Sequence, residues 1–191
     1  MPQLPSRKRY LLIGTAAAVL VISGALLRQF LFAPPATVGD FSIPFLPGWG
    51  REVAEGKNAQ SVFFNRGTTT MRVMWLKPRQ RSQPKTASDL VAIYKKGLVA
   101  RMGRPEKLKE RWKLVSTSGR PLVLHGMTAF LAEEKFSGEQ AGSTKSLSLI
   151  KGNRYYILSS YLKSNADRAA EASALADRDA AWQKLIDSLK K

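Results

Sequence analysis

Eight cationic side chains between residues 77 and 104 are the group in this chain best suited to do chemistry. Lysine and arginine bind phosphate and carboxylate groups, and a cluster of such charges attracts polyanions and raises the rate of encounter with them. The default interpretation is a charged face that meets only solvent; the alternative, which makes this cluster the best binding candidate of the chain, is contact with an anionic partner. The residues are Lys77, Arg79, Arg81, Lys85, Lys95, Lys96, Arg101 and Arg104.

The only histidine, His125, is the second candidate. It alternates with Val123 and Met127, which predicts a histidine packed on the face of a strand rather than a metal ligand or a catalytic base. A zinc site would need further histidine or cysteine ligands nearby, and the chain contains no cysteine. A catalytic serine of the Gly-x-Ser-x-Gly type would need a motif that does not occur in the sequence.

Two further motifs fit no catalytic pattern. A phosphate-binding loop has four residues between its glycines and a Ser or Thr after its lysine. Here five residues separate Gly50 from Gly56, and Asn58 follows the lysine. Glu133 and Glu134 are adjacent in a predicted strand, so they point to opposite faces, and we expect both to be solvated. The sequence therefore predicts no catalytic residue, no bound metal or cofactor, and no enzymatic activity.

The composition is strongly basic. The chain has 31 lysines and arginines against 14 acidic residues, for a net charge of +17. Roughly +13 of this charge lies after Ala36, and such a field favours anionic partners. We expect other subunits of a membrane complex and anionic lipid headgroups as partners, and nucleic acid only if the domain is not exported or if the protein handles exported DNA. The lack of cysteine excludes a lipid-modified cysteine anchor and is compatible with an oxidising compartment.

An apolar stretch, Leu11 to Phe32, follows the basic cluster Arg7-Lys8-Arg9. As a helix it would be about 33 Å long, enough for a hydrocarbon core of about 30 Å. Pro34-Pro35 would end this helix because proline has no amide hydrogen to donate. We therefore predict an uncleaved transmembrane helix at residues 11–32; the alternative is a signal peptide cleaved near Ser23-Gly24-Ala25.

This segment also determines the predicted topology. Cations beside an apolar helix favour the cytoplasmic side of the membrane. Residues 1–10 are then a cytoplasmic basic N-terminus, 33–39 a linker, and 40–191 a soluble domain in the periplasm. The prediction is a single-pass protein of the bacterial inner membrane.

Residues 40–191 are predicted to form four strands, a helix, four more strands and a last helix. Residues 86–102 have apolar side chains at helical spacing, with Thr86 as the cap, and Asn165 is expected to cap the last helix. Residues 118–121 are expected to form a turn between two strands. The predicted fold class is α+β: a single N-terminal transmembrane helix, then an antiparallel β-sheet with helices packed on it. The expected strands are 41–45, 49–54, 60–65, 69–76, 112–117, 122–136, 144–150 and 154–162.

Three short motifs mark the domain. They are Phe41-Ser42-Ile43-Pro44 leading to Leu46-Pro47-Gly48-Trp49, Ser118-Gly119-Arg120-Pro121 before a long strand, and a closing helix with Trp182 and Leu185. In these motifs the domain resembles the Mog1/PsbP-like family, which includes periplasmic members of the DcrB type, over about residues 40 to 190. The resemblance implies a sheet covered by helices and a non-enzymatic role, often as an accessory or assembly factor of a larger complex, and it offers no site residue to carry over.

Two functional hypotheses follow. The first is a membrane-anchored, non-enzymatic periplasmic accessory, scaffold or assembly subunit of a membrane protein complex. The second is a basic module that binds a polyanion, either anionic lipid or nucleic acid, through residues 77–113. The second predicts an affinity that falls steeply with salt, and the first does not require it.

Overall fold

The computed structural model describes residues 34–76, 83–103 and 111–190. The chain divides into two compact units, Met1–Pro34 and Pro35–Lys191, and every helix and strand below belongs to the second. Strands hold 50% of the described residues and helices 26%. The predicted fold class is therefore wrong: the described chain is mostly β, because its last four strands alone are 10 to 12 residues long.

The described residues do not contain the membrane helix of that prediction either. None of their helices combines the length and the apolar character that a membrane crossing requires. The predicted cytoplasmic segment 1–10 and the predicted helix 11–32 lie outside the described ranges.

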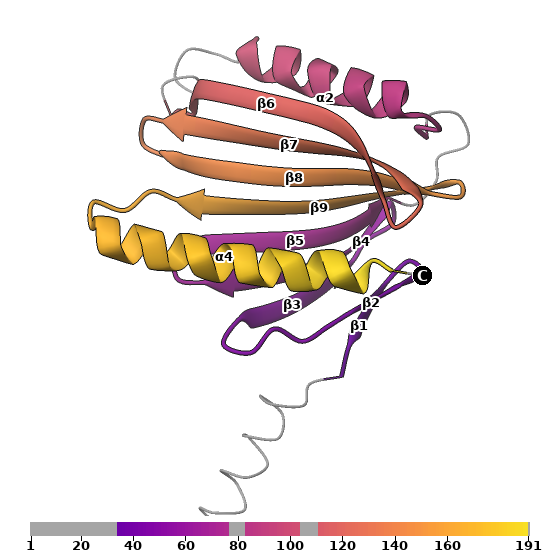
Figure 1. Cartoon of the computed structure of the whole chain (residues 1–191), viewed down its shortest axis with the longest axis horizontal. Helices are drawn as coiled ribbons and strands as arrows, with labels where there is room; N and C mark the ends of the chain where they lie inside the picture. Colours follow the sequence, from indigo (N-terminus) through magenta and orange to yellow (C-terminus); the bar gives the residue numbers. More distant parts are fainter. Residues whose placement is uncertain (1–33, 77–82, 104–110, 191) are drawn as a thin grey trace, which may run out of the picture. The chain divides into compact units, whose positions relative to one another are not determined.

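Seven antiparallel strands form one curved sheet in the order β3-β4-β5-β9-β8-β7-β6 (Figure 1). Strand β9, the last in sequence, inserts between β5 and β8 and so joins the two halves of the domain. A separate ribbon pairs β1 with β2, and β1 falls within the predicted linker 33–39. The strands are β1 Ala36–Val38, β2 Phe41–Ile43, β3 Gly50–Glu55, β4 Ala59–Arg66, β5 Thr69–Leu76, β6 Lys113–Leu124, β7 Met127–Ser137, β8 Gly142–Lys151 and β9 Arg154–Lys163.

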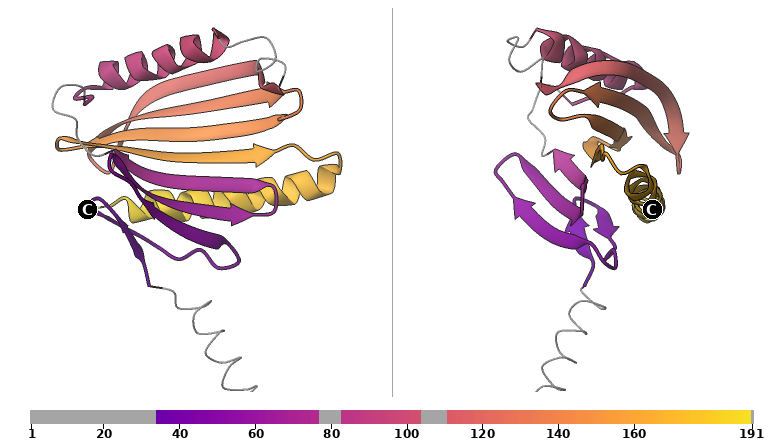
Figure 2. Two further views of the ribbon diagram at one scale, coloured as in Figure 1. Left: turned by 180° about the vertical axis from the view of Figure 1, so that it is seen from behind. Right: turned by 90° about the vertical axis from the view of Figure 1, so that its left-hand side faces the viewer.

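Two helices pack on opposite faces of the sheet, as the front and rear views show (Figures 1 and 2). Helix α2 contacts β7, and helix α4 contacts β9 and β2. The predicted cap of α2 is confirmed, because Thr86 accepts from the Asp89 amide. Asp89 in turn accepts from the Thr86 amide, which completes a capping box. The cap of α4 is Asp167 and not Asn165, whose side chain accepts from the Asp167 amide instead. The helices span α2 Ala87–Met102 and α4 Arg168–Ser188.

The larger part of the core lies between α4 and the sheet. Trp182 and Leu185 of α4 belong to one buried cluster with Tyr156 and Leu158 of β9 and with the β1–β2 ribbon. A smaller cluster lies under α2, where Leu90 joins side chains of β7, β8 and β9. These central strands are apolar on both faces over part of their length because each face is covered by a helix.

The strand predicted at 122–136 is two strands in the structure. Strand β6 ends at Leu124, and His125 and Gly126 form the turn that leads into β7. Their φ values are 50° and 78°. Two positive φ values in a two-residue loop are the geometry of a type I′ turn, for which Asn-Gly is the usual signal. Here histidine takes the first position, so the sequence lacks the usual Asn-Gly signal for this turn.

The turn predicted at 118–121 is instead the middle of β6. A Cβ on Gly119 would lie 2.6 Å from the Phe130 ring and 3.4 Å from the Tyr94 ring, so the glycine provides space for packing. Pro121 is compatible with this strand because β6 is an edge of the sheet. Glycine and proline therefore mark close packing and a sheet edge here rather than a turn.

Asp40 connects the β1–β2 ribbon to the sheet. Its carboxylate accepts hydrogen bonds from Arg154 and Tyr156, and its amide donates to the Tyr156 hydroxyl over 3.2 Å. The Gly39 amide donates to the side chain of Gln60 over 3.0 Å. The ribbon is thus fixed to both β9 and β4.

Candidate functional site

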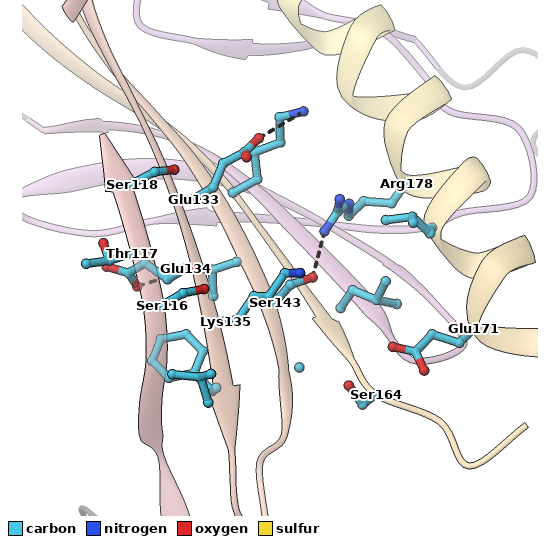
Figure 3. Close-up of a pocket in the computed structure, with 17 residues that line it drawn as sticks. Ser116, Thr117, Ser118, Glu133, Glu134, Lys135, Ser143, Ser164, Glu171 and Arg178 are labelled. Atoms are coloured by element: carbon cyan, nitrogen blue, oxygen red, sulfur yellow. Dashed lines mark hydrogen bonds and ion pairs between the residues drawn. The ribbon is translucent and has the colours of Figure 1, made fainter. Parts of the chain in front are cut away.

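An open cleft of about 540 Å³ lies between the first half of α4 and one face of β6, β7 and β8 (Figure 3). Helix α4 contributes side chains at a spacing of three to four residues, so that they lie on one side of the helix. The strands contribute alternate residues, which point to the same face of the sheet. These side chains are Glu171, Leu175 and Arg178 from α4, Ser116 and Ser118 from β6, Glu133 and Lys135 from β7, and Ser143 and Lys145 from β8.

Arg178 is the most firmly held cation of the cleft. It is only 7% exposed. Its Nη1 donates to the Ser143 hydroxyl over 3.0 Å, and its Nε and Nη2 donate to the Asp179 carboxylate over 3.2 and 3.1 Å. A buried charge needs such partners because desolvation without them is costly. Arg178 is therefore fixed in position and links α4 to β8.

Lys145 is the second cation that the surrounding residues position. Its Nζ lies 3.6 Å from the Glu133 carboxylate and 5.5 Å from the centre of the Trp182 ring. The ring attracts the ammonium group through its electron-rich face. Lys135 also lines the cleft and is exposed. The strand side of the cleft therefore presents two lysines, Lys135 on β7 and Lys145 on β8, with Glu133 beside Lys145.

The cleft also has apolar walls. Leu175 is 40% exposed and Val115 is 62% exposed, although both are aliphatic. The pairing of β6 with β7 shifts between Leu114 and Ser116, which leaves Val115 as the extra residue of a bulge. The lining thus combines fixed cations, serine hydroxyls and exposed aliphatic side chains. None of the described residues that line it is a histidine.

The structure describes four of the eight cations that the sequence singled out. Lys95 and Lys96 are exposed on α2, and Lys85 is exposed just before it. Arg101 forms an ion pair with Glu134 instead of facing a partner. Lys77, Arg79, Arg81 and Arg104 lie outside the described residues. The cleft contains none of the described members of this group, so sequence reasoning missed its residues.

Glu134 is a buried carboxylate that the sequence analysis placed in solvent. It is 5% exposed, which contradicts that prediction. It accepts hydrogen bonds from Arg101 Nη1 and from the Tyr94 hydroxyl, both over 3.0 Å, and from the Thr144 hydroxyl over 3.3 Å. Burial of its side chain between α2 and the sheet raises the pKa of Tyr94 above its ordinary value. The predicted opposite orientation of the two glutamates is confirmed, because Glu133 faces Lys145 in the cleft.

His125 lies in the exposed turn between β6 and β7. The prediction of a histidine packed on a strand face is wrong, because the chain reverses direction at this residue. His125 does not line the cleft.

Comparison with known proteins leaves the family of this chain open. No protein-family model matches the chain, and no curated protein matches it. Among solved structures, that of PA94 from Pseudomonas aeruginosa, a protein of unknown function, matches over 82% of this chain and 95% of its own. The sequence identity is 13% and the TM-score 0.38, a likeness too remote to carry an argument. The resemblance to the Mog1/PsbP-like family stays a prediction.

Proposed function

We propose that this chain is a non-enzymatic accessory or scaffold subunit of a membrane protein complex in the periplasm, and that its folded unit binds a partner subunit in the cleft between α4 and β6–β8. One observation carries this proposal. The cleft is open, about 540 Å³ in volume, and lined by side chains that are already ordered by contacts within the unit.

The lining favours a segment of another protein as the occupant. Arg178 and Lys145 are held before any partner arrives, so binding costs little side-chain entropy at these positions. Leu175 and Val115 would lose contact with water on binding, which is favourable for aliphatic groups. A polypeptide offers both backbone carbonyls for the cations and side chains for the aliphatic walls.

The sequence supports the membrane location of this partner. The apolar segment 11–32, which lies outside the described residues, would hold the unit close to the membrane. Confinement near a partner raises its effective concentration without any new contact. A weak contact in the cleft would then suffice for assembly.

Co-purification tests this function. The full chain, tagged after Lys191 and extracted in mild detergent at native expression, should bring one partner subunit in a constant ratio. Leu175→Arg or Ser118→Arg places a bulky cation in the cleft and should release that partner. Ala176→Arg is the matched control, because Ala176 is exposed on α4 and does not line the cleft. A solitary monomer, or equal release by the control, would contradict the proposal.

A polyanion-binding module is the second candidate, and the outer face of α2 favours it. Lys95 and Lys96 are exposed there, while Asp89, the one acidic residue of α2, is engaged in the capping box. Binding of the full chain to anionic vesicles or heparin should then weaken steeply with salt, and Lys95→Glu with Lys96→Glu should weaken it further. A flat salt response would remove this candidate.

A further inference from the structure

The sheet face under α2 changes from apolar to polar along the strands. Phe130, Ile150 and Tyr155 lie in the apolar cluster with Leu90 of α2. Further along, Arg72 of β5 pairs directly with Ser159 of β9, and Ser159 pairs directly with Ser146 of β8. Directly paired residues point to the same face and are about 5 Å apart. These three residues therefore form a polar row across three central strands.

A cavity of about 310 Å³ lies over this polar row. Tyr94 and Arg101 of α2 and Glu134 of β7 also line it. The cavity differs from the cleft that we assign to the partner subunit, because Lys145 lines the cleft while its neighbour Ser146, on the opposite face of β8, lines the cavity. Glu134 and Thr144 border both. The hydroxyls of Thr70, Ser146 and Ser159 in its lining make no hydrogen bond to any of the residues that the structure describes.

Arg72 presents one free edge of its guanidinium group. Its Nε and Nη2 donate to the Ser61 hydroxyl over 3.3 and 2.9 Å, and the group lies 4.8 Å from the centre of the Phe63 ring. These contacts fix the group and use one of its two donor edges, which leaves the Nη1 hydrogens and one on Nη2. No carboxylate within the described ranges pairs with Arg72.

The charge balance of the cavity points to an anion. The charge of Arg101 is matched by Glu134 over 3.0 Å. The charge of Arg72 is the one that stays unmatched among the described lining residues. A fixed guanidinium edge beside hydroxyl groups is the donor set that binds oxyanions with two or more oxygens.

We propose that this cavity binds a phosphate group, either free or as a phosphate monoester. The Nη edge of Arg72 takes two of its oxygens, and the hydroxyls of Ser159, Ser146 and Thr70 donate to the others. A tetrahedral anion suits this set better than a planar carboxylate, because its oxygens point in enough directions to meet donors from β5, β9 and β8. Arg101 and Glu134 form one wall of the site as a neutral pair.

Titration of the full chain in detergent tests the proposal with two probes, inorganic phosphate and glycerol 3-phosphate, at constant ionic strength. We expect one saturable site by calorimetry for at least one probe, and the preferred probe distinguishes free phosphate from a monoester. Arg72→Gln should weaken binding at least tenfold. Arg168→Gln is the matched control, because Arg168 is exposed at the start of α4, and it should leave binding unchanged.

A second variant guards against a folding defect in Arg72→Gln. Ser146→Ala with Ser159→Ala removes two hydroxyls without touching the Arg72 contacts to Ser61 and Phe63, and it should weaken binding several-fold. The absence of a saturable site for both probes, or wild-type affinity in the serine variant, would overturn the proposal. Leu175→Arg should not alter phosphate binding, so failure of this site and failure of the partner cleft are separable.

Discussion

At the residue scale, Glu134 is the charged group on which the packing of α2 most depends. Donors from two elements converge on it: Arg101 and Tyr94 from α2 and Thr144 from β8. Removing one partner of a buried ion pair costs more than the pair contributes, because the other charge loses its partner. The neighbouring Glu133 is 54% exposed in its own ion pair, so it provides a natural comparison.

Glu134→Gln should lower the free energy of unfolding by about 1 to 2 kcal/mol. The loss is smaller than for two buried charges because the Arg101 side chain is 37% exposed. Glu133→Gln should change the free energy of unfolding by less than about 0.5 kcal/mol. Urea denaturation followed by circular dichroism measures both values. Equal losses in the two variants would show that Glu134 does not hold α2 in place.

Four tyrosines should make the fold sensitive to alkaline pH. Burial raises the pKa of Tyr94, Tyr155, Tyr156 and Tyr161 above the ordinary value. An unfolded tyrosine ionises near pH 10, and the folded one ionises only at higher pH. Between these values the folded state holds more protons than the unfolded state, so stability is complete below about pH 10 and falls as pH rises.

Tyr155→Phe should reduce this alkaline loss, because Tyr155 is only 7% exposed and its ionisation is opposed by burial. Urea midpoints at about pH 8.5 and about pH 10.5 measure the loss in each protein. Titration of the lysines is common to both proteins and cancels in the comparison. An identical loss in wild type and variant would show that the ionisation of Tyr155 does not contribute to the loss of stability.

Residue-scale prediction from the sequence was correct for orientation and wrong for burial. Strand alternation alone places Glu133 and Glu134 on opposite faces. The burial of Glu134 depends on Arg101, which lies 33 residues away and arrives from α2. No pattern of neighbouring residues in the sequence predicts this contact between Arg101 and Glu134. The same holds for Arg178 and Ser143, which are 35 residues apart in the cleft.

At the scale of elements, edge strand β6 shows why glycine and proline led to the wrong prediction of a turn at residues 118–121. Gly119 and Pro121 have turn-forming character in any sequence window. In β6 the glycine admits the Phe130 ring, and the proline lies in a strand with one unpaired side. The true turn contains His125, whose positive φ a histidine adopts only at some energetic cost. Sequence reasoning had no means to prefer this position.

His125→Asn should stabilise the β6–β7 hairpin by about 0.5 kcal/mol, because Asn-Gly is the preferred pair for a type I′ turn. Gly126→Ala should destabilise it by about 1 kcal/mol or more, because φ at Gly126 is 78°. Thermal unfolding of both variants, compared with wild type, shows whether each substitution raises or lowers the stability. A stabilising Gly126→Ala would refute the assigned turn.

At the scale of the whole molecule, both helices within the described residues and most strands were predicted near their observed positions. The excess of strand over helix and the short strand β1 were not. Nor could the sequence show that β9 inserts beside β5, since the pair Thr69 and Leu162 joins residues far apart in the chain. The candidate cleft depends on that arrangement, because it forms only where α4 returns over strands from the middle of the sequence.

The position of the folded unit relative to a membrane is a prediction for the whole chain. An alkaline phosphatase reporter fused after Lys191 should be active, because this enzyme folds with its disulfides only outside the cytoplasm. Replacing Arg7, Lys8 and Arg9 with Glu should reduce that activity by weakening the cytoplasmic retention of the N-terminus. An inactive phosphatase fusion, together with fluorescence from a green fluorescent protein fused at the same position, would contradict the predicted topology.

The link between Asp40 and β9 has a mechanical consequence. Tension applied ahead of Pro35 would first peel the three β1–β2 pairs, beginning at Ala36 and Ile43. It would next load the contacts of Asp40 with Arg154 and Tyr156, which are attached to a central strand rather than to an edge. Force would therefore spread over the whole sheet, and single-molecule pulling should show a small early extension followed by one cooperative rupture.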